Sequence, residues 1–148
     1  MKGMSVIVKT VTSLVAALIA IFGIYIVLYG HLTPGGGFSG GVILGCGLIL
    51  LCLAFGRGFA EEVLSRRMAL IFGCIGPLAF LAVAAMLGYG SGRGFFANVL
   101  WGGGEAGFVL TDGGTILPSN LAIGAEVAGC LFGVFLALAV FRPGSNAT

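Results

Sequence analysis

Four long apolar stretches dominate this sequence, and they decide what the chain can fold into. Residues 11–29, 34–55, 68–89 and 121–141 contain one charged residue between them, Glu126. Each stretch is close to the roughly 20 residues that an α-helix needs to cross the hydrocarbon core of a bilayer. With 59% hydrophobic and 8% charged residues, the chain does not belong to the soluble globular class.

We therefore expect an all-α integral membrane protein with four transmembrane helices, at about residues 8–29, 34–55, 68–89 and 120–141. The whole chain, residues 1–148, is expected to form one membrane domain. The first span is expected to be retained, because its apolar stretch is longer than that of a cleaved signal peptide. Nothing in the net charge of +2 calls for a nucleic-acid partner.

The basic residues predict the orientation in the membrane. Six of the seven lie before span one, between spans two and three, or after span four: Lys2, Lys9, Arg57, Arg66, Arg67 and Arg142. Arg93 falls in the other connections. Because cytoplasmic loops carry an excess of Lys and Arg, both termini are predicted to be cytoplasmic. The loop at His31 and the long glycine-rich connection of residues 90–120 would then lie outside.

The first of these outer loops combines a titratable ring with a backbone that is almost free of side chains. His31 is followed by Thr33 and Pro34, a pairing typical of a helix N-cap and the first helical position. The glycines that follow, at 35, 36 and 37, allow close approach to the peptide groups. His31 can pass a proton at physiological pH, or its ring can simply bond a loop carbonyl.

Glu126 is the second candidate for chemistry. An ionised carboxylate at the centre of a membrane helix costs about 2.5 to 3.5 kcal/mol, so it should be protonated, paired or next to a hydrated cavity. If the last span starts at Leu121, Glu126 lies five residues further along, about 8 Å deep on the side of His31. That placement permits a proton or cation path through both residues. The structural alternative is a protonated glutamate that donates one hydrogen bond to a neighbouring helix.

Small residues at four-residue spacing predict two close-packing helix faces. Gly37, Gly41 and Gly45 form one, and Ala125, Gly129 and Gly133 form the other. These faces pack either within the chain or against other subunits, and four short helices favour other subunits.

The remaining patterns carry less chemistry. The Asp-Gly pair at 112–113 predicts a β-hairpin over residues 108–117. The four cysteines all lie within spans and are interpreted as small apolar residues, with no metal site or disulfide. No cofactor is expected, because the glycine triplet at 35, 37 and 40 follows a membrane helix and lacks the acidic residue of a dinucleotide site.

The segment from Gly30 to Gly41 resembles the Gly-His-x-x-Pro-Gly-Gly-Gly-Phe-x-Gly-Gly signature of the MnhB family. This family comprises the B subunits of multisubunit Mrp-type Na+/H+ antiporters. The resemblance extends to the charged turn after span two, the long outer connection, and the acid at Glu126 in the last span.

The resemblance implies a small multi-pass subunit of the inner (plasma) membrane that works with other membrane subunits and transports Na+ and H+. It would help form the ion path and hold the small subunits together. An equivalent subunit of a membrane-bound hydrogenase or related redox complex, a pure assembly scaffold, and a self-contained oligomeric channel remain open alternatives. The absence of a nucleophile–base pair, metal set or cofactor motif argues against an enzyme.

Overall fold

The computed structural model describes residues 4–100 and 109–140. Four of its helices are long and apolar enough to cross a membrane, which confirms the predicted four-span, all-α class. They are α1 (Val6–Leu28), α2 (Gly36–Phe55), a third span from Arg66 to Gly90, and α6 (Ile116–Val140). The third span consists of α4 (Arg66–Ala82), a π-helical turn (Val83–Leu87) and the short α5 (Gly88–Gly90). A seven-residue helix, α3 (Arg57–Val63), joins α2 to α4.

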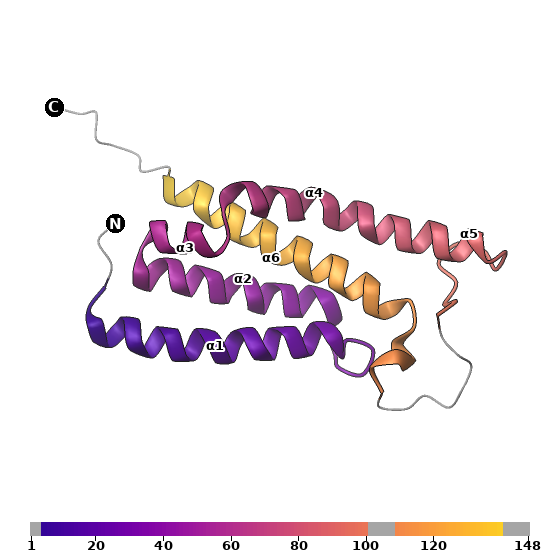
Figure 1. Cartoon of the computed structure of the whole chain (residues 1–148), viewed down its shortest axis with the longest axis horizontal. Coiled ribbons are helices and arrows are strands. Elements are labelled where there is room, and N and C mark those ends of the chain that lie inside the picture. Colours follow the sequence, from indigo (N-terminus) through magenta and orange to yellow (C-terminus); the bar gives the residue numbers. More distant parts are fainter. Residues whose placement is uncertain (1–3, 101–108, 141–148) are drawn as a thin grey trace.

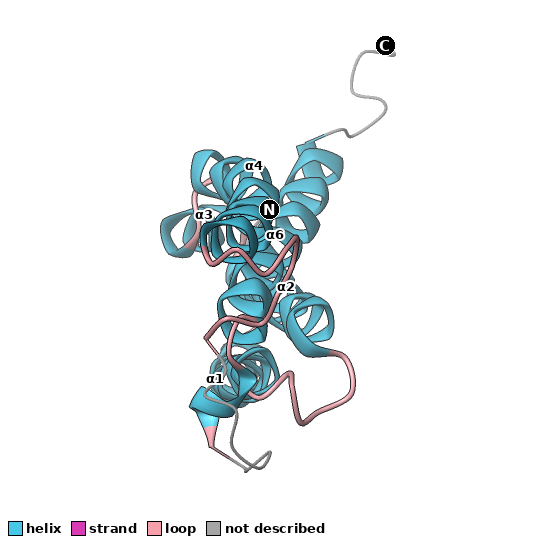
Figure 2. Ribbon diagram, turned by 90° about the vertical axis from the view of Figure 1, so that its right-hand side faces the viewer, coloured by secondary structure: helices cyan, strands magenta, loops and turns pink. Residues whose placement is uncertain are grey.

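The long helices lie side by side in one row, in the order α1, α2, α6, α4 (Figures 1 and 2). Successive spans along the chain run in opposite directions, so that α2 and α6 are parallel neighbours, and the first turn of α1, the short α3 and the last turn of α6 lie at one end. The loops that follow α1 and α5 lie at the other end. A third or less of each span is buried within the chain. A row of this kind leaves two broad faces open, and α6 is an inner helix with neighbours on both sides.

The start of α6 corrects the sequence analysis. The predicted hairpin over residues 108–117 is wrong, because Leu110–Gly113 forms the 3-10 helix η2 and α6 already begins at Ile116. Residues 101–108 of the outer connection lie outside the described part of the chain. Pro118 fits the first turn of a helix, where no intrahelical bond needs its missing N–H. Thr115 precedes the helix, and its backbone N–H and hydroxyl both donate to the Asn98 side-chain oxygen, at 2.8 and 3.0 Å.

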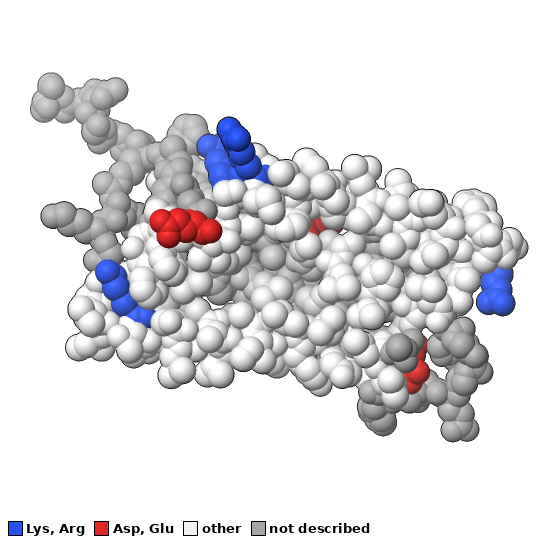
Figure 3. Space-filling view, viewed as in Figure 1, with Lys and Arg blue, Asp and Glu red and all other residues white. Residues whose placement is uncertain are grey.

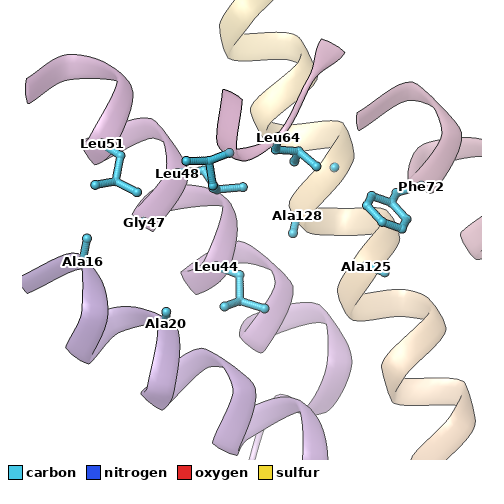
Figure 4. Close-up of a pocket in the computed structure, with 12 residues that line it drawn as sticks. Ala16, Ala20, Leu44, Gly47, Leu48, Leu51, Leu64, Phe72, Ala125 and Ala128 are labelled. Atoms are coloured by element: carbon cyan, nitrogen blue, oxygen red, sulfur yellow. The ribbon is translucent and has the colours of Figure 1, made fainter. Parts of the chain in front are cut away.

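The buried core lies near the end that carries α3. Its fully enclosed members are Phe132 and Leu136 of α6, packed with Cys52 of α2 and Ala69 of α4. Towards the α1 side, a cavity of about 330 Å³ opens between the helices, walled by apolar side chains such as Ala16, Leu44 and Phe72 (Figure 4). The described side chains that line this cavity are all apolar.

Charged side chains gather towards the two ends of the row, and one acidic side chain shows in its otherwise uncharged middle (Figure 3). Lys9, Arg66 and Arg67 lie at the end with α3, and Arg93 follows α5 at the other. Lys2 and Arg142 lie outside the described residues. Since Lys and Arg favour the cytoplasmic side, this distribution supports the predicted orientation, which stays a prediction.

Candidate functional site

Three hydrogen bonds in the loop between α1 and α2 converge on one carbonyl group. The Tyr29 carbonyl accepts the backbone N–H groups of Leu32 and Thr33, both at 2.9 Å, and the Thr33 hydroxyl at 3.0 Å. Thr33 therefore closes the end of α1, and the prediction that it caps α2 with Pro34 as the first helical residue is wrong. The chain turns into α2 through Gly35 and Gly36, whose φ angles of +115° and +54° disfavour other residues.

The N-terminus of α2 is capped from a distant part of the sequence. The N-cap residue Gly35 has no side chain to serve this role, and the Gly37 N–H donates instead to Oδ1 of Asn120 on α6, at 3.2 Å. The contact is buried, and Asn120 is 9% exposed. A Cβ on Gly36 would lie 3.1 Å from Oδ1, and one on Gly37 would lie 2.9 Å from the Asn120 Cα.

We call Gly30, Gly36, Gly37 and Asn120 the loop clasp, because the three glycines leave the room that the asparagine side chain fills. The sequence analysis identified the glycines but missed Asn120. The sequence offers one signal for Asn120, a lone amide in the first turns of an otherwise apolar span. Nothing in the sequence pairs Gly37 with Asn120, because the two residues lie 83 positions apart.

His31 lies beside this clasp. Its ring stacks on Tyr29, with 6.3 Å between ring centroids and 21° between ring planes. Gly113 of η2 lies under the imidazole, since a Cβ there would be 3.0 Å from Nδ1. Both ring nitrogens are buried, and neither has a hydrogen-bond partner among the described residues. The alternative role for His31, a bond from its ring to a loop carbonyl, is therefore not found among the described residues.

Glu126 lies deeper than the sequence analysis predicted. Because α6 begins at Ile116, Glu126 is ten residues into the helix, about 15 Å along its axis. A measurement from the opposite end of the row, along α4, gives the same depth for Glu126. Gly76 of α4 lies directly against Glu126 and is ten residues past Arg66, where α4 begins at the other end. About 15 Å from each end is the middle of a hydrocarbon core about 30 Å thick.

Glu126 lines an open groove between α2 and α6. The groove has a volume of about 330 Å³, and its other walls are apolar side chains or a thiol: Phe38, Val42, Val127, Cys130, Leu131 and Val134. Glu126 is partly exposed, and no hydrogen bond or ion pair reaches it from residues 4–100 or 109–140. His31 does not line the groove, so the structure does not bring the two predicted ion-path residues into one site.

Both predicted glycine faces pack inside the chain. On α2, a Cβ on Gly41 would lie 2.7 Å from the Gly124 carbonyl oxygen, and one on Gly45 would lie 3.0 Å from Leu131, both on α6. On the other side of α6, a Cβ on Gly129 would lie 2.9 Å from the Ala69 carbonyl of α4. A Cβ on Gly133 would lie 3.8 Å from the Ala69 side chain. The helices that occupy these faces belong to this chain, and not to a partner as the sequence analysis favoured.

The cysteines form no metal site within the described residues, although Cys130 lines the Glu126 groove. Cys46, Cys74 and Cys130 are exposed on the helix surfaces, and Cys52 is buried in the core. Within the described residues, no group of three His, Cys, Asp or Glu side chains is placed to hold a metal ion.

The comparison with known families matches residues 7–133 to the domain described as related to the MnhB subunit of Na+/H+ antiporter. The chain belongs to the MnhB family. The chain is 34% identical over 90 residues to a Staphylococcus saprophyticus protein named "Putative antiporter subunit mnhB2". It is 41% identical over 80 residues to a protein of the same name from Staphylococcus aureus strain Newman.

These two alignments cover only part of each protein. The S. saprophyticus alignment covers 61% of this chain and 64% of the relative. The S. aureus alignment covers 51% of this chain and 55% of the relative. The comparison thus establishes the family, while the activity and the partners of this MnhB-family chain are inferred from its site.

Proposed function

We propose that this chain is a small integral subunit of a multisubunit Na+/H+ antiporter of the plasma membrane, in which Glu126 contributes to the ion path. Family membership and the names of the two relatives support an antiporter over a hydrogenase-like host. The observation that carries the ionic role is the partly exposed, unpaired carboxylate at the middle of the span. A charge at that depth costs about 2.5 to 3.5 kcal/mol, and such residues mark ion pathways by default.

The groove also argues against a self-contained channel. A transporter that works alone usually builds its site from several polar groups at mid-membrane, between internal repeats. In the described part of this chain, one acid, Glu126, lies at that depth. The partners of the chain are therefore other membrane subunits, and Na+ and H+ are the ions that the assembly exchanges.

His31 is the second residue that we assign to the ion path. It lies at the loop end of the row, at the side of η2, while Glu126 lies at mid-depth. An ion that used both residues would pass His31 near the membrane surface and Glu126 further in. The loop clasp, with Thr33, Pro34 and Gly35 beside it, would keep that entrance in shape.

The subunit role is tested by purifying the tagged chain from membranes in a mild detergent and identifying the proteins that accompany it. We expect large antiporter-type membrane subunits. A stable monomer or homo-oligomer alone would contradict the subunit role, and co-purified redox subunits would assign the chain to the hydrogenase-like host.

The ionic role is tested with Glu126→Gln, which keeps the size and hydrogen-bonding capacity of a protonated glutamate but cannot ionise. We expect normal assembly and loss of cation-driven proton flux in inverted vesicles. Glu62→Gln is the matched control, because Glu62 is an exposed carboxylate on α3, outside the spans. Full flux with Glu126→Gln at matched complex levels would leave the scaffold role as the better account.

A further inference from the structure

One side of the groove at Glu126 is a strip of the α6 surface that no other helix of this chain covers. Glu126, Cys130, Val134 and Leu138 follow one another at four-residue steps along α6. Val134 is 58% exposed and Leu138 is 68% exposed, although both belong to an inner helix of the row. Across the groove, Phe38 of α2 is 64% exposed. The strip therefore forms part of one broad face that this chain does not cover.

The carboxylate decides what kind of molecule can cover this face. The rest of the groove is apolar, so a lipid tail would fit its walls. A lipid tail has no hydrogen-bond donor, however, and would leave a polar group at mid-membrane without a partner. An occupant that matches the whole groove must combine an apolar surface with a donor at the depth of Glu126.

The dimensions of the groove fit a helix. From Glu126 to Val134 the wall extends eight residues, about 12 Å along α6, which is slightly more than two helical turns. Its α6 wall is built from pairs of side chains at four-residue intervals, and Phe38 and Val42 repeat this interval on α2. Rows with this interval are the ridges between which a third helix packs.

A second copy of the chain does not supply the missing donor. In a two-fold contact through this groove, the same surface meets itself, and two Glu126 carboxylates would face one another. The described basic side chains lie towards the two ends of the row, Lys9, Arg66 and Arg67 at the end with α3 and Arg93 at the other, away from this depth.

We propose that the Glu126 groove receives a transmembrane helix of another subunit, which presents a Lys, Arg, His or hydroxyl side chain to the carboxylate. This inference rests on the proposed function, because it assumes a multisubunit assembly. It adds the location of the interface and the chemistry of the partner at the ion-path residue.

Photo-crosslinking in the assembled complex tests this inference. The photoreactive amino acid p-benzoylphenylalanine is placed at Phe38 or Val134, at either end of the groove, and at Leu14 of α1 as a control. Leu14 is 67% exposed but lies on the outer helix of the row, away from the groove. We expect both groove positions to react with one transmembrane segment of another subunit that has such a donor between the two crosslinked residues, about two turns from the one captured at Val134.

Substitution of Glu126 tests whether this residue stabilises the contact, because a helix that is merely nearby would give the same adduct yield without it. With Glu126→Leu, the adduct yield at Phe38 should fall about tenfold, the change expected if a contact worth about 1.4 kcal/mol is lost. Glu126→Gln keeps a hydrogen-bonding group and should retain most of the yield, and the yield at Leu14 should not change. Crosslinking in the parent complex, with Glu126 in place, already identifies the partner segment, so the test holds even if the leucine variant fails to assemble.

Three results would overturn the inference: adducts with phospholipid alone, adducts with a second copy of this chain, or a partner segment without a donor near the contact. Each is distinguishable from failure of the proposed function. If the chain purifies with antiporter subunits and flux depends on Glu126, the proposed function stands even when the groove captures only lipid.

Discussion

Gly41 is the position at which the packing of this fold is most directly testable. A Cβ on Gly41 would lie 2.7 Å from the Gly124 carbonyl oxygen, 2.8 Å from the Val127 Cβ and 3.1 Å from the Gly124 Cα. Ordinary contact begins at 3.4 Å, so even alanine requires α2 and α6 to separate by about 0.7 Å at this point. Two of the three obstructing atoms belong to the backbone and cannot rotate away.

Overpacking of this kind costs about 1 to 3 kcal/mol for a small side chain, and leucine adds three further carbons at the same place. For Gly41→Ala, the ratio of folded to unfolded protein should fall about 5- to 150-fold. For Gly41→Leu, we expect loss of the folded subunit and hence of the complex. The structural reason is separation of two helices of the same chain.

The measurement is thermal unfolding in mild detergent, followed by reaction of the buried Cys52 thiol with a fluorescent maleimide. The exposed Cys46, Cys74 and Cys130 are replaced by alanine in every variant, so that the signal reports the core. Gly58→Leu is the matched control, because Gly58 lies in helix α3 and a Cβ there meets nothing within 4 Å. If Gly41→Leu unfolds at the temperature of the parent and assembles normally, the close packing of α2 on α6 is wrong.

Three further predictions follow from the site. Asn120→Ala leaves the buried Gly37 N–H without an acceptor and should destabilise the chain by about 1 to 3 kcal/mol in the same unfolding assay; Asn120→Asp, which keeps an acceptor oxygen, should be milder. Gly76→Ala places a methyl group against the Glu126 backbone and side chain, so it should lower both stability and cation-driven flux; unchanged flux would contradict the close contact. His31→Phe should leave the unfolding temperature nearly unchanged, because no described residue bonds the ring nitrogens, while flux should fall if His31 lies on the ion path.

The four spans could be predicted because they depend on local properties of the sequence. Length and the absence of charge decide whether a segment can cross a bilayer, and each predicted range overlaps its observed helix. The glycine faces were also visible, because four-residue spacing places side chains on one face of a helix. The helices that pack against these faces could not be predicted, because the order of helices in the row depends on contacts between distant segments.

The helix ends were harder to predict, because they depend on single contacts. Thr33 before Pro34 has the composition of an N-cap, but the Thr33 hydroxyl bonds back to Tyr29 and leaves the capping of α2 to Asn120. The start of α6 was placed too late, because Thr115 and Ile116 also suit a strand. That error made Glu126 look shallow and close to His31.

The arrangement of the helices explains why a mid-membrane acid can be open to the outside of its own subunit. In a compact bundle, an acid on an inner helix would face the centre and find a partner there. Here Gly41 and Gly45 bring α2 against one side of α6, and Gly76 brings α4 against the other, so that α6 is enclosed only in the plane of the row. Glu126 lies against Gly76 of α4 and also lines the groove between α2 and α6. With the interface proposed above, an ion path that uses Glu126 would run along a boundary between subunits, and its second wall would come from another chain.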